Sequence, residues 1–179
     1  MRVISGEYRS RILKSLPGLD SRPTLAKVKG AVFNHLGSLQ NKSFLDLFCG
    51  CGNIGIEALS RGAAIVCFND NNPQAIKVLQ SNLDLLKIDG RRAKVSSWHY
   101  RAFLSKQDEP FDFIYLDPPF ELNCLAECLG LIAERGLLKE DGELIIESEG
   151  IIAEDYPRFE LLKTARYGRI RVAYYRNGN

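Results

Sequence analysis

The stretch YLDPPF, residues 115–120, places a carboxylate, two prolines and an aromatic ring directly after an apolar run. Asp117 and a backbone carbonyl of the Pro118-Pro119 pair can each accept one N–H of an exocyclic amine on a nucleic-acid base. Proline rings keep such acceptors in place, so that the nitrogen lone pair can be aimed at an electrophile. Phe120 can stack on the base, a contact of about 1–3 kcal/mol. The alternative is a simple strand stop, because proline cannot donate to a sheet ladder.

A second candidate site is the glycine-rich segment between the first predicted strand and the helix that follows it. Gly50, Gly52 and Gly55 form the pattern GxGxxG. Glycines at this point let the backbone approach a ligand and let a helix and a strand pack closely. Asp70 follows the second predicted strand, 20 residues after Gly50. An acid there can accept hydrogen bonds from a ribose diol, although a turn or helix-capping role is the alternative.

The adenosine cofactor that this pattern suggests is either NAD or S-adenosylmethionine. Asp46 lies four residues before Gly50, at the carboxyl end of the first strand. A carboxylate there repels a pyrophosphate and attracts the ammonium group of a methionyl moiety. S-adenosylmethionine carries that ammonium and a sulfonium but no phosphate, so the sequence favours it. Two neighbouring residues, Phe48 and Asn71, are further candidate contacts of this cofactor.

The net charge of +2 conceals two basic ends on an acidic body. Residues 1–35 hold seven basic and two acidic residues, and residues 156–179 hold six basic residues and one acidic residue. Basic ends suit a partner that is bound through its phosphates, although chance clustering of surface charge is the alternative. The candidate RNA-binding residues in these segments are Arg2, Arg9, Arg11, Lys14, Arg169 and Arg171.

Strands and helices alternate from residue 43 onward. Short apolar runs predict strands at 43–48, 64–68, 93–97, 111–116 and 142–149. Helical spacing and a proline start predict helices at 53–62, 73–88, 101–106 and 124–138. The tail alternates enough for two strands with a turn at Tyr167-Gly168. We therefore predict an α/β, Rossmann-like fold with a mainly parallel seven-stranded sheet, helices on both faces and an antiparallel C-terminal edge.

The N-terminal region differs in pattern from the rest. Residues 1–16 are basic and alternate as a hairpin or arm would, and a helix is predicted at about 24–36. The five cysteines form no CxxC pair and only two histidines are present, so we expect reduced, buried thiols and no metal site. The sequence shows no signal peptide and no apolar run near the ~18 residues of a membrane helix. We expect a cytoplasmic protein, monomeric and free of membranes.

Over nearly its whole length the chain resembles the RsmD-type 16S ribosomal RNA guanine-N2 methyltransferases, which are class I S-adenosylmethionine enzymes. The resemblance rests on RVISGEYRSRIL, RPT, VFNHL, FLDLFCGCGNIGIEALSRGA, YLDPPF, GELIIESE and YGRIRVAYYR. It implies a methyltransferase domain at 37–179 and, at 1–36, a basic arm followed by a helix that covers the cofactor. It also implies cofactor contacts from Arg22 and Thr24, and 16S ribosomal RNA or a small-subunit assembly particle as the partner.

Two positions depart from that family pattern. Relatives usually carry Glu at the ribose position, where this chain has Asp70. They commonly place Asp or Asn against the adenine amine, where this chain has His99. The backbone near His99 is then expected to contact the adenine, with Trp98 packed on the ring. Burial of Trp98 in the core is the alternative.

Other functions account for fewer of these features. A DNA or RNA adenine-N6 methyltransferase has similar cofactor and DPPF chemistry, but a DNA enzyme usually needs a target-recognition domain for which this chain has no room. A protein-glutamine methylase favours NPPY. A nicotinamide oxidoreductase leaves DPPF without a role, and a non-enzymatic RNA-binding protein leaves Asp46 and Asp117 unexplained.

Overall fold

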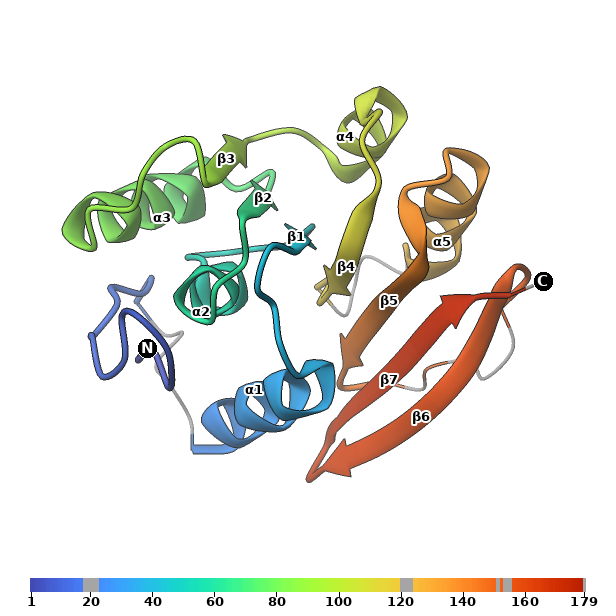
Figure 1. Ribbon diagram of the computed structural model, residues 1–179, viewed down its shortest axis with the longest axis horizontal. Helices are drawn as coiled ribbons and strands as arrows, with labels where there is room; N and C mark the ends of the chain where they lie inside the picture. Colours follow the sequence, from blue (N-terminus) through green and yellow to red (C-terminus); the bar gives the residue numbers. More distant parts are fainter. Residues whose placement is uncertain (18–22, 120–123, 151, 153–155, 179) are drawn as a thin grey trace.

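A seven-stranded sheet in the order β3-β2-β1-β4-β5-β7-β6 forms the centre of the molecule (Figure 1). The computed structural model describes residues 1–17, 23–119, 124–150, 152 and 156–178, with the backbone alone at 23–25. The first five strands are parallel to one another, and the last two are antiparallel to their neighbours. The predicted fold class is therefore confirmed, and the C-terminal strands β7 and β6 form the expected antiparallel edge.

The central strands are short and mostly buried, as a sheet covered on both faces requires. The sheet comprises β1 (Ser43–Asp46), β2 (Ile65–Asn69), β3 (Ala93–Ser96), β4 (Phe111–Leu116), β5 (Leu138–Ser148), β6 (Phe159–Tyr167) and β7 (Ile170–Asn177). Every residue of β4 is buried, because β4 lies at the centre of the sheet with helices on both sides. The chain order reverses between β1 and β4, and in open α/β sheets this point forms the ligand crevice.

Among the described residues, five helices cover the two faces of the sheet (Figure 1). Alternate strand residues divide the core, with Phe44 on the face of the first three helices and Leu45 on the opposite face. The helices of the first face are α1 (Pro23–Leu36), α2 (Asn53–Ser60) and α3 (Pro73–Leu85). Those of the second face are α4 (Tyr100–Lys106) and α5 (Leu125–Glu134).

The last predicted helix ends earlier than its apolar spacing suggested. Helix α5 stops at Glu134 because Gly136 adopts a left-handed conformation with φ of 61°. The Leu137 N–H then bonds the Ile132 carbonyl at 3.0 Å, the hydrogen bond typical of a Schellman stop. The residues up to Leu138 that we assigned to this helix instead lead into β5, which starts four residues before the predicted strand.

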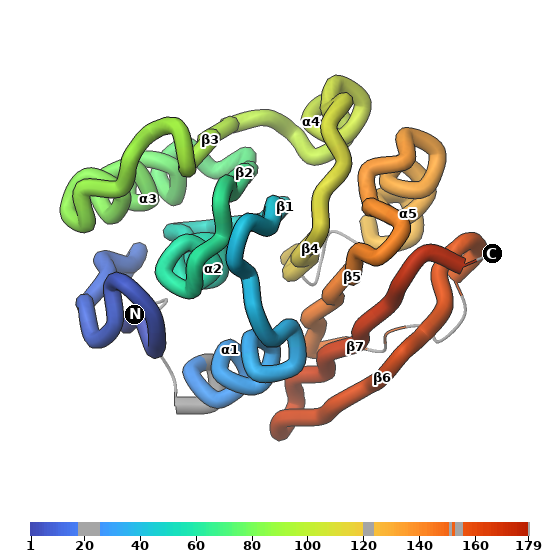
Figure 2. Tube along the Cα trace, viewed as in Figure 1, coloured from blue at the N-terminus to red at the C-terminus, as the bar shows by residue number. Residues whose placement is uncertain are grey.

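The N-terminal hairpin, defined here as residues 1–14, packs on the face of the sheet that α1, α2 and α3 cover. The Val3 N–H donates to the Arg11 carbonyl at 3.0 Å, and Arg2 pairs with Ile12 in an antiparallel bridge. Val3 and Leu13 are 1% and 2% exposed, so the inner side of the hairpin is part of the hydrophobic core. Figure 2 shows the hairpin beside α2 and α3.

Candidate active site

Three aspartates lie at the carboxyl ends of three adjacent strands. Asp46 is the last residue of β1, Asp70 follows β2, and Asp117 follows β4. Strand β1 lies between the other two and pairs with both, with Asp46 opposite Phe68 and Tyr115. The carboxyl ends of the parallel strands therefore bring together the acids that the sequence analysis singled out.

The glycine loop, defined here as residues 49–53, joins β1 to α2. Gly50 and Gly52 have φ of 50° and 88°, a left-handed backbone that favours glycine. A Cβ on Gly52 would lie 2.4 Å from Leu79 Cδ1, and one on Gly55 would lie 2.2 Å from Phe68 Cε1. Gly52 and Gly55 therefore permit close packing of α2. A Cβ on Gly50 would meet no atom within 4 Å, so Gly50 borders open space where a ligand can approach.

Asp70 connects the end of β2 to the glycine loop. Its Oδ2 accepts the Gly50 N–H at 2.8 Å, and its Oδ1 accepts the Asn72 N–H at 2.8 Å. The cap of α3 is Asn72, whose side chain accepts the N–H groups of Gln74 and Ala75. Helix capping therefore does not explain Asp70, although its bond to Asn72 is a turn contact. Its carboxylate holds the first glycine of the loop.

Asp46 is 2% exposed, and its Oδ2 accepts the Gly55 N–H at 2.8 Å. Burial raises the pKa of Asp46 to about 7, and the charges of Asp70 and Glu147 act in the same direction. The hydrogen bond from Gly55 opposes this shift. Asp46 therefore accepts a hydrogen bond from the first turn of α2, and its pKa lies near neutral pH.

Asp117 and Glu147 form a second acidic pair at the ends of β4 and β5. Asp117 is exposed to solvent at the end of β4. Desolvation raises its pKa well above the usual range, together with the charges of Glu147, Asp46 and Glu149. Glu147 is 6% exposed and accepts the hydroxyl hydrogen of Tyr115. Desolvation also raises the pKa of Glu147, against that hydrogen bond.

Sequence reasoning missed Glu147 and Asn69 as parts of this site. A carboxylate at the end of the apolar run LIIES was the available signal for Glu147. Asn69 is buried, donates to the Leu47 carbonyl at 3.3 Å, and accepts hydrogen bonds from Ser96 Oγ at 2.9 Å and the Trp98 N–H at 3.3 Å. It therefore fixes the ends of β1, β2 and β3 relative to one another.

The predicted adenine contacts lie beyond β3. Trp98 is 47% exposed, so its burial in the core is excluded, and Lys106 Nζ lies 4.8 Å from its ring centroid. His99 is the N-cap of α4, where its ring Nδ1 accepts the Arg101 N–H. Phe48, near the same edge, contacts the Tyr100 ring at 5.9 Å. Asn71 is exposed beside Asp70.

Several predicted residues cannot be placed in full. Arg22 and Phe120 lie outside the described residues, and Thr24 is described only as part of the α1 backbone. Pro118 and Pro119 follow β4 as predicted, and no cis peptide bond occurs in the described chain.

The predicted RNA-binding cations are all exposed, namely Arg2, Arg9, Arg11, Lys14, Arg169 and Arg171. Four of them belong to the N-terminal hairpin. Of the other two, Arg169 lies in the turn between β6 and β7, and Arg171 is the second residue of β7. Arg169 pairs with Glu149 at 3.2 Å, just beyond the end of β5. The C-terminal cations therefore lie near the carboxyl ends of the parallel strands, where Asp117 also lies.

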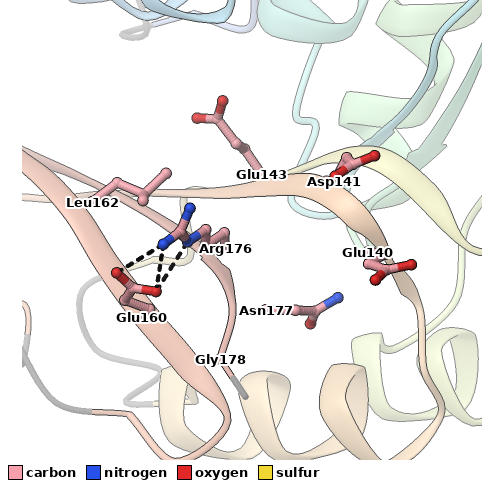
Figure 3. A pocket seen from close by; sticks show the side chains of 9 residues that line it. Glu140, Asp141, Glu143, Glu160, Leu162, Arg176, Asn177 and Gly178 are labelled. Atoms are coloured by element: carbon pink, nitrogen blue, oxygen red, sulfur yellow. Dashed lines mark hydrogen bonds and ion pairs between the residues drawn. The ribbon is translucent and has the colours of Figure 1, made fainter.

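A cavity of about 700 Å³ lies elsewhere, at the amino end of β5 (Figure 3). Its lining includes Glu140, Asp141, Glu143 and Glu160, and Arg176 is held by Glu160 at 2.8 Å. It is at the opposite end of β5 from Glu147, so it is separate from the aspartates of the crevice.

Metal and membrane features are absent from the part of the chain that the structure describes. No three His, Cys, Asp or Glu side chains there are grouped to hold a metal ion. No described helix is long and apolar enough to span a membrane. The five cysteines are free and buried, as predicted.

The chain is similar to one group of proteins along nearly its whole length. Residues 1–176 match the family model "Conserved hypothetical protein 95". The chain is 37% identical to the "Putative rRNA methyltransferase YlbH" of Bacillus subtilis, with 98% of each chain covered. It is 34% identical to "Ribosomal RNA small subunit methyltransferase D" of Haemophilus influenzae, over 99% of this chain and 94% of the relative. The solved structure "Putative methyltransferase yhhF from Escherichia coli" has a TM-score of 0.88 at 30% identity, with 99% and 97% of the two chains covered.

Proposed function

The chain belongs to the family described as conserved hypothetical protein 95, and we propose that it transfers a methyl group from S-adenosylmethionine to the N2 amine of a guanine in small-subunit ribosomal RNA. The names of two relatives, an rRNA methyltransferase and a small-subunit rRNA methyltransferase, support the reaction and the class of substrate. The choice of guanine N2 rests on the resemblance described above.

The observation that carries this proposal is the cluster of carboxyl groups, Asp46, Asp70 and Asp117, at the carboxyl ends of three adjacent strands. Asp46, Asp117 and Glu147 all have raised pKa values, and no lysine or arginine of the described chain contributes to these shifts. Such a site disfavours the pyrophosphate of a dinucleotide and favours a cation. The two positive groups of S-adenosylmethionine, its ammonium and sulfonium, fit this donor set.

Residues at the carboxyl ends of β1, β2 and β3 would hold this cofactor. Asp70 has the position to accept the ribose hydroxyls, Asp46 to attract the ammonium, and Gly50 to let the backbone approach. Trp98, with its exposed face, is suited to pack on the adenine. When bound, S-adenosylmethionine supplies an electrophilic methyl group. Arg22 and Thr24 would cover it from the segment before and within α1.

Asp117 would orient the amine that receives the methyl group. Its carboxylate accepts one N–H and a Pro118-Pro119 carbonyl accepts the other, which directs the nitrogen lone pair toward the methyl carbon. Phe120 would stack on the extruded base. After transfer the nitrogen must lose one proton. Burial and the neighbouring carboxylates raise the pKa of Asp117, so its ionised form is a better proton acceptor than an ordinary aspartate.

RNA would reach the crevice along the exposed cations of both ends of the chain. In this proposal residues 1–36 supply the basic arm and the helix over the cofactor, and residues 37–179 form the methyltransferase domain. The RNA is 16S ribosomal RNA, either free or within a small-subunit assembly particle. Phosphate contacts supply affinity, and the DPPF loop selects the base.

The direct test is methyl transfer from labelled S-adenosylmethionine to 16S ribosomal RNA, free and in small-subunit particles. We expect N2-methylguanosine after digestion to nucleosides, identified by mass spectrometry. N6-methyladenosine in its place would support the adenine-N6 alternative. The absence of any methylated nucleoside with either substrate would contradict the proposal.

A further inference from the structure

Two buried polar side chains on different helices each join the N-terminal hairpin to the glycine loop. They are Asn82 of α3 and Lys29 of α1, which are 0% and 2% exposed. Neither was expected from the sequence, where both fall on helices with ordinary polar spacing. Buried polar groups are retained at a cost in desolvation, so their partners indicate what they do.

Asn82 contacts one residue of each segment. Its Oδ1 accepts the Lys14 N–H at 2.8 Å, and its Nδ2 donates to the Lys14 carbonyl at 3.1 Å. The same Nδ2 donates to the Cys51 carbonyl at 3.0 Å, in the centre of the glycine loop. Asn82 therefore uses its whole amide to connect the end of the hairpin with the loop.

Lys29 makes the equivalent connection at the other end of the loop. Its Nζ donates to the Arg2 carbonyl at 2.7 Å and to Asn53 Oδ1 at 2.8 Å. It also lies 3.3 Å from a Glu57 carboxylate that is 0% exposed. Glu57 in turn accepts the N–H groups of Ile4 and Ser5 at 2.8 and 3.0 Å. One buried charge network thus holds the hairpin against the first turn of α2.

We infer that Asn82 and Lys29 are positioning residues of the glycine loop, and that they couple the ligand of this loop to the ligand of the N-terminal hairpin. Cys51 and Asn53 are the neighbours of Gly52 in the chain. Asn82 and Lys29 hold these two residues against the backbone of the hairpin. The outer side of that hairpin carries four exposed cations. A partner that orders the hairpin then stabilises the loop, and by linkage the cofactor raises the affinity for that partner by the same factor. This coupling rests on the proposed function, whereas the positioning of the loop does not.

The first test uses the ligand-free protein and compares variants that loosen the hairpin in different places. Asn82→Ala removes the bond to Cys51, and Lys29→Met removes the bond to Asn53 while preserving most of the side-chain volume. Ser60→Ala is the matched control, because buried Ser60 accepts the Tyr8 N–H at 2.9 Å and donates to the Ser5 carbonyl without touching the loop.

Hydrogen exchange of the loop amides is the decisive readout. We expect exchange at residues 50–53 to become about tenfold faster in Asn82→Ala and in Lys29→Met. In Ser60→Ala it should stay within about twofold of wild type, although hairpin amides exchange faster. Equal protection of the loop in all three variants would overturn the inference, and Lys29→Met keeps the test valid if Asn82→Ala fails to fold.

The second test measures affinity for S-adenosylhomocysteine with and without a saturating 16S ribosomal RNA fragment. We expect RNA to tighten binding in wild type and in Ser60→Ala, and Asn82→Ala to bind about tenfold more weakly with that gain abolished. An RNA effect that persists unchanged in Asn82→Ala would contradict the coupling. If wild type binds no S-adenosylhomocysteine, the proposed function fails while the exchange result still decides the positioning role.

Discussion

Asp70 accepts the backbone N–H of Gly50 at 2.8 Å, although 20 residues separate them in the chain. This bond ties the end of β2 to the loop that follows β1, at the point where Gly50 borders open space. A carboxylate oxygen has more than one lone pair, so Asp70 can hold the loop and still accept a ribose hydroxyl. The same residue therefore shapes the proposed cofactor site and contacts its ligand.

Replacement of Asp70 should weaken cofactor binding strongly. We expect Asp70→Ala to lower the affinity for S-adenosylhomocysteine by about 1.5–3 kcal/mol, measured by titration calorimetry, because a charged acceptor is lost. Asn72→Ala is the control, since it removes the cap of α3 two residues away. The control should cost about 1 kcal/mol of unfolding free energy and leave the affinity unchanged. Unchanged affinity in Asp70→Ala would show that the ribose lies elsewhere.

Asp46 should make the protein less stable as pH rises toward neutrality. Its pKa is raised from 3.8 to about 7, so between these values the unfolded chain has released a proton that the folded protein still holds. The unfolding free energy therefore falls with rising pH, by up to about 1.4 kcal/mol per pH unit from this group, and levels off above pH 7. The raised pKa values of Asp117 and Glu147 act with the same sign.

Urea unfolding between pH 4 and pH 8 measures this dependence. Asp46→Asn keeps a side-chain oxygen for the Gly55 N–H and removes the titrating group, so the slope of unfolding free energy against pH should decrease. Asp108→Asn is a suitable control because Asp108 is an exposed carboxylate far from the crevice, paired with Arg135. Identical slopes in wild type and Asp46→Asn would mean that the buried carboxylate does not hold its proton.

The sequence predicted the sheet and the positions of three aspartates because both depend on local pattern. Apolar runs that alternate with helical spacing define the parallel strands, and an acid directly after such a run must lie at the carboxyl edge of the sheet. Asp46, Asp70 and Asp117 follow from this rule. Helix ends were less well predicted, because Gly136 stops α5 through a left-handed turn while the apolar spacing continues to Leu138.

The site residues that the sequence analysis did not identify depend on contacts between distant segments. Asn82 and Lys29 fall on helices where a polar residue normally faces water, but in the folded chain both are buried against the backbone of the hairpin. Glu147 ends an apolar strand, but its contact with Tyr115 requires knowing that β5 lies beside β4. The hairpin itself looked like a free arm because its basic residues dominate the pattern. Val3 and Leu13, which attach it to the core, do not stand out in the sequence.

The exposed cations should determine how RNA affinity depends on salt. Deletion of residues 1–14 is a poor test, since it would expose the core that Val3 and Leu13 cover. We expect Arg9→Ala with Arg11→Ala to weaken RNA binding and to reduce the slope of log K against log salt by roughly 1.5–2. Arg91→Ala is the control, an exposed arginine outside both basic segments that pairs with Asp89. A slope equal to that of wild type in the double variant would remove the hairpin from the RNA interface.

Asp117 should govern the chemical step and leave RNA affinity nearly unchanged. Its carboxylate is the proposed acceptor for the target amine, so Asp117→Ala should slow single-turnover methyl transfer by about 100- to 1,000-fold at saturating RNA. Asp117→Asn keeps a carbonyl acceptor and should retain more of that rate. It should also lose the fall in rate toward low pH, because the group whose raised pKa produces that fall has been removed. Glu149→Gln removes a nearby charge but no acceptor, and its rate should stay within about twofold of wild type. A fully active Asp117→Ala enzyme would leave the two prolines after β4 as a strand stop and would remove the basis for the proposed chemistry.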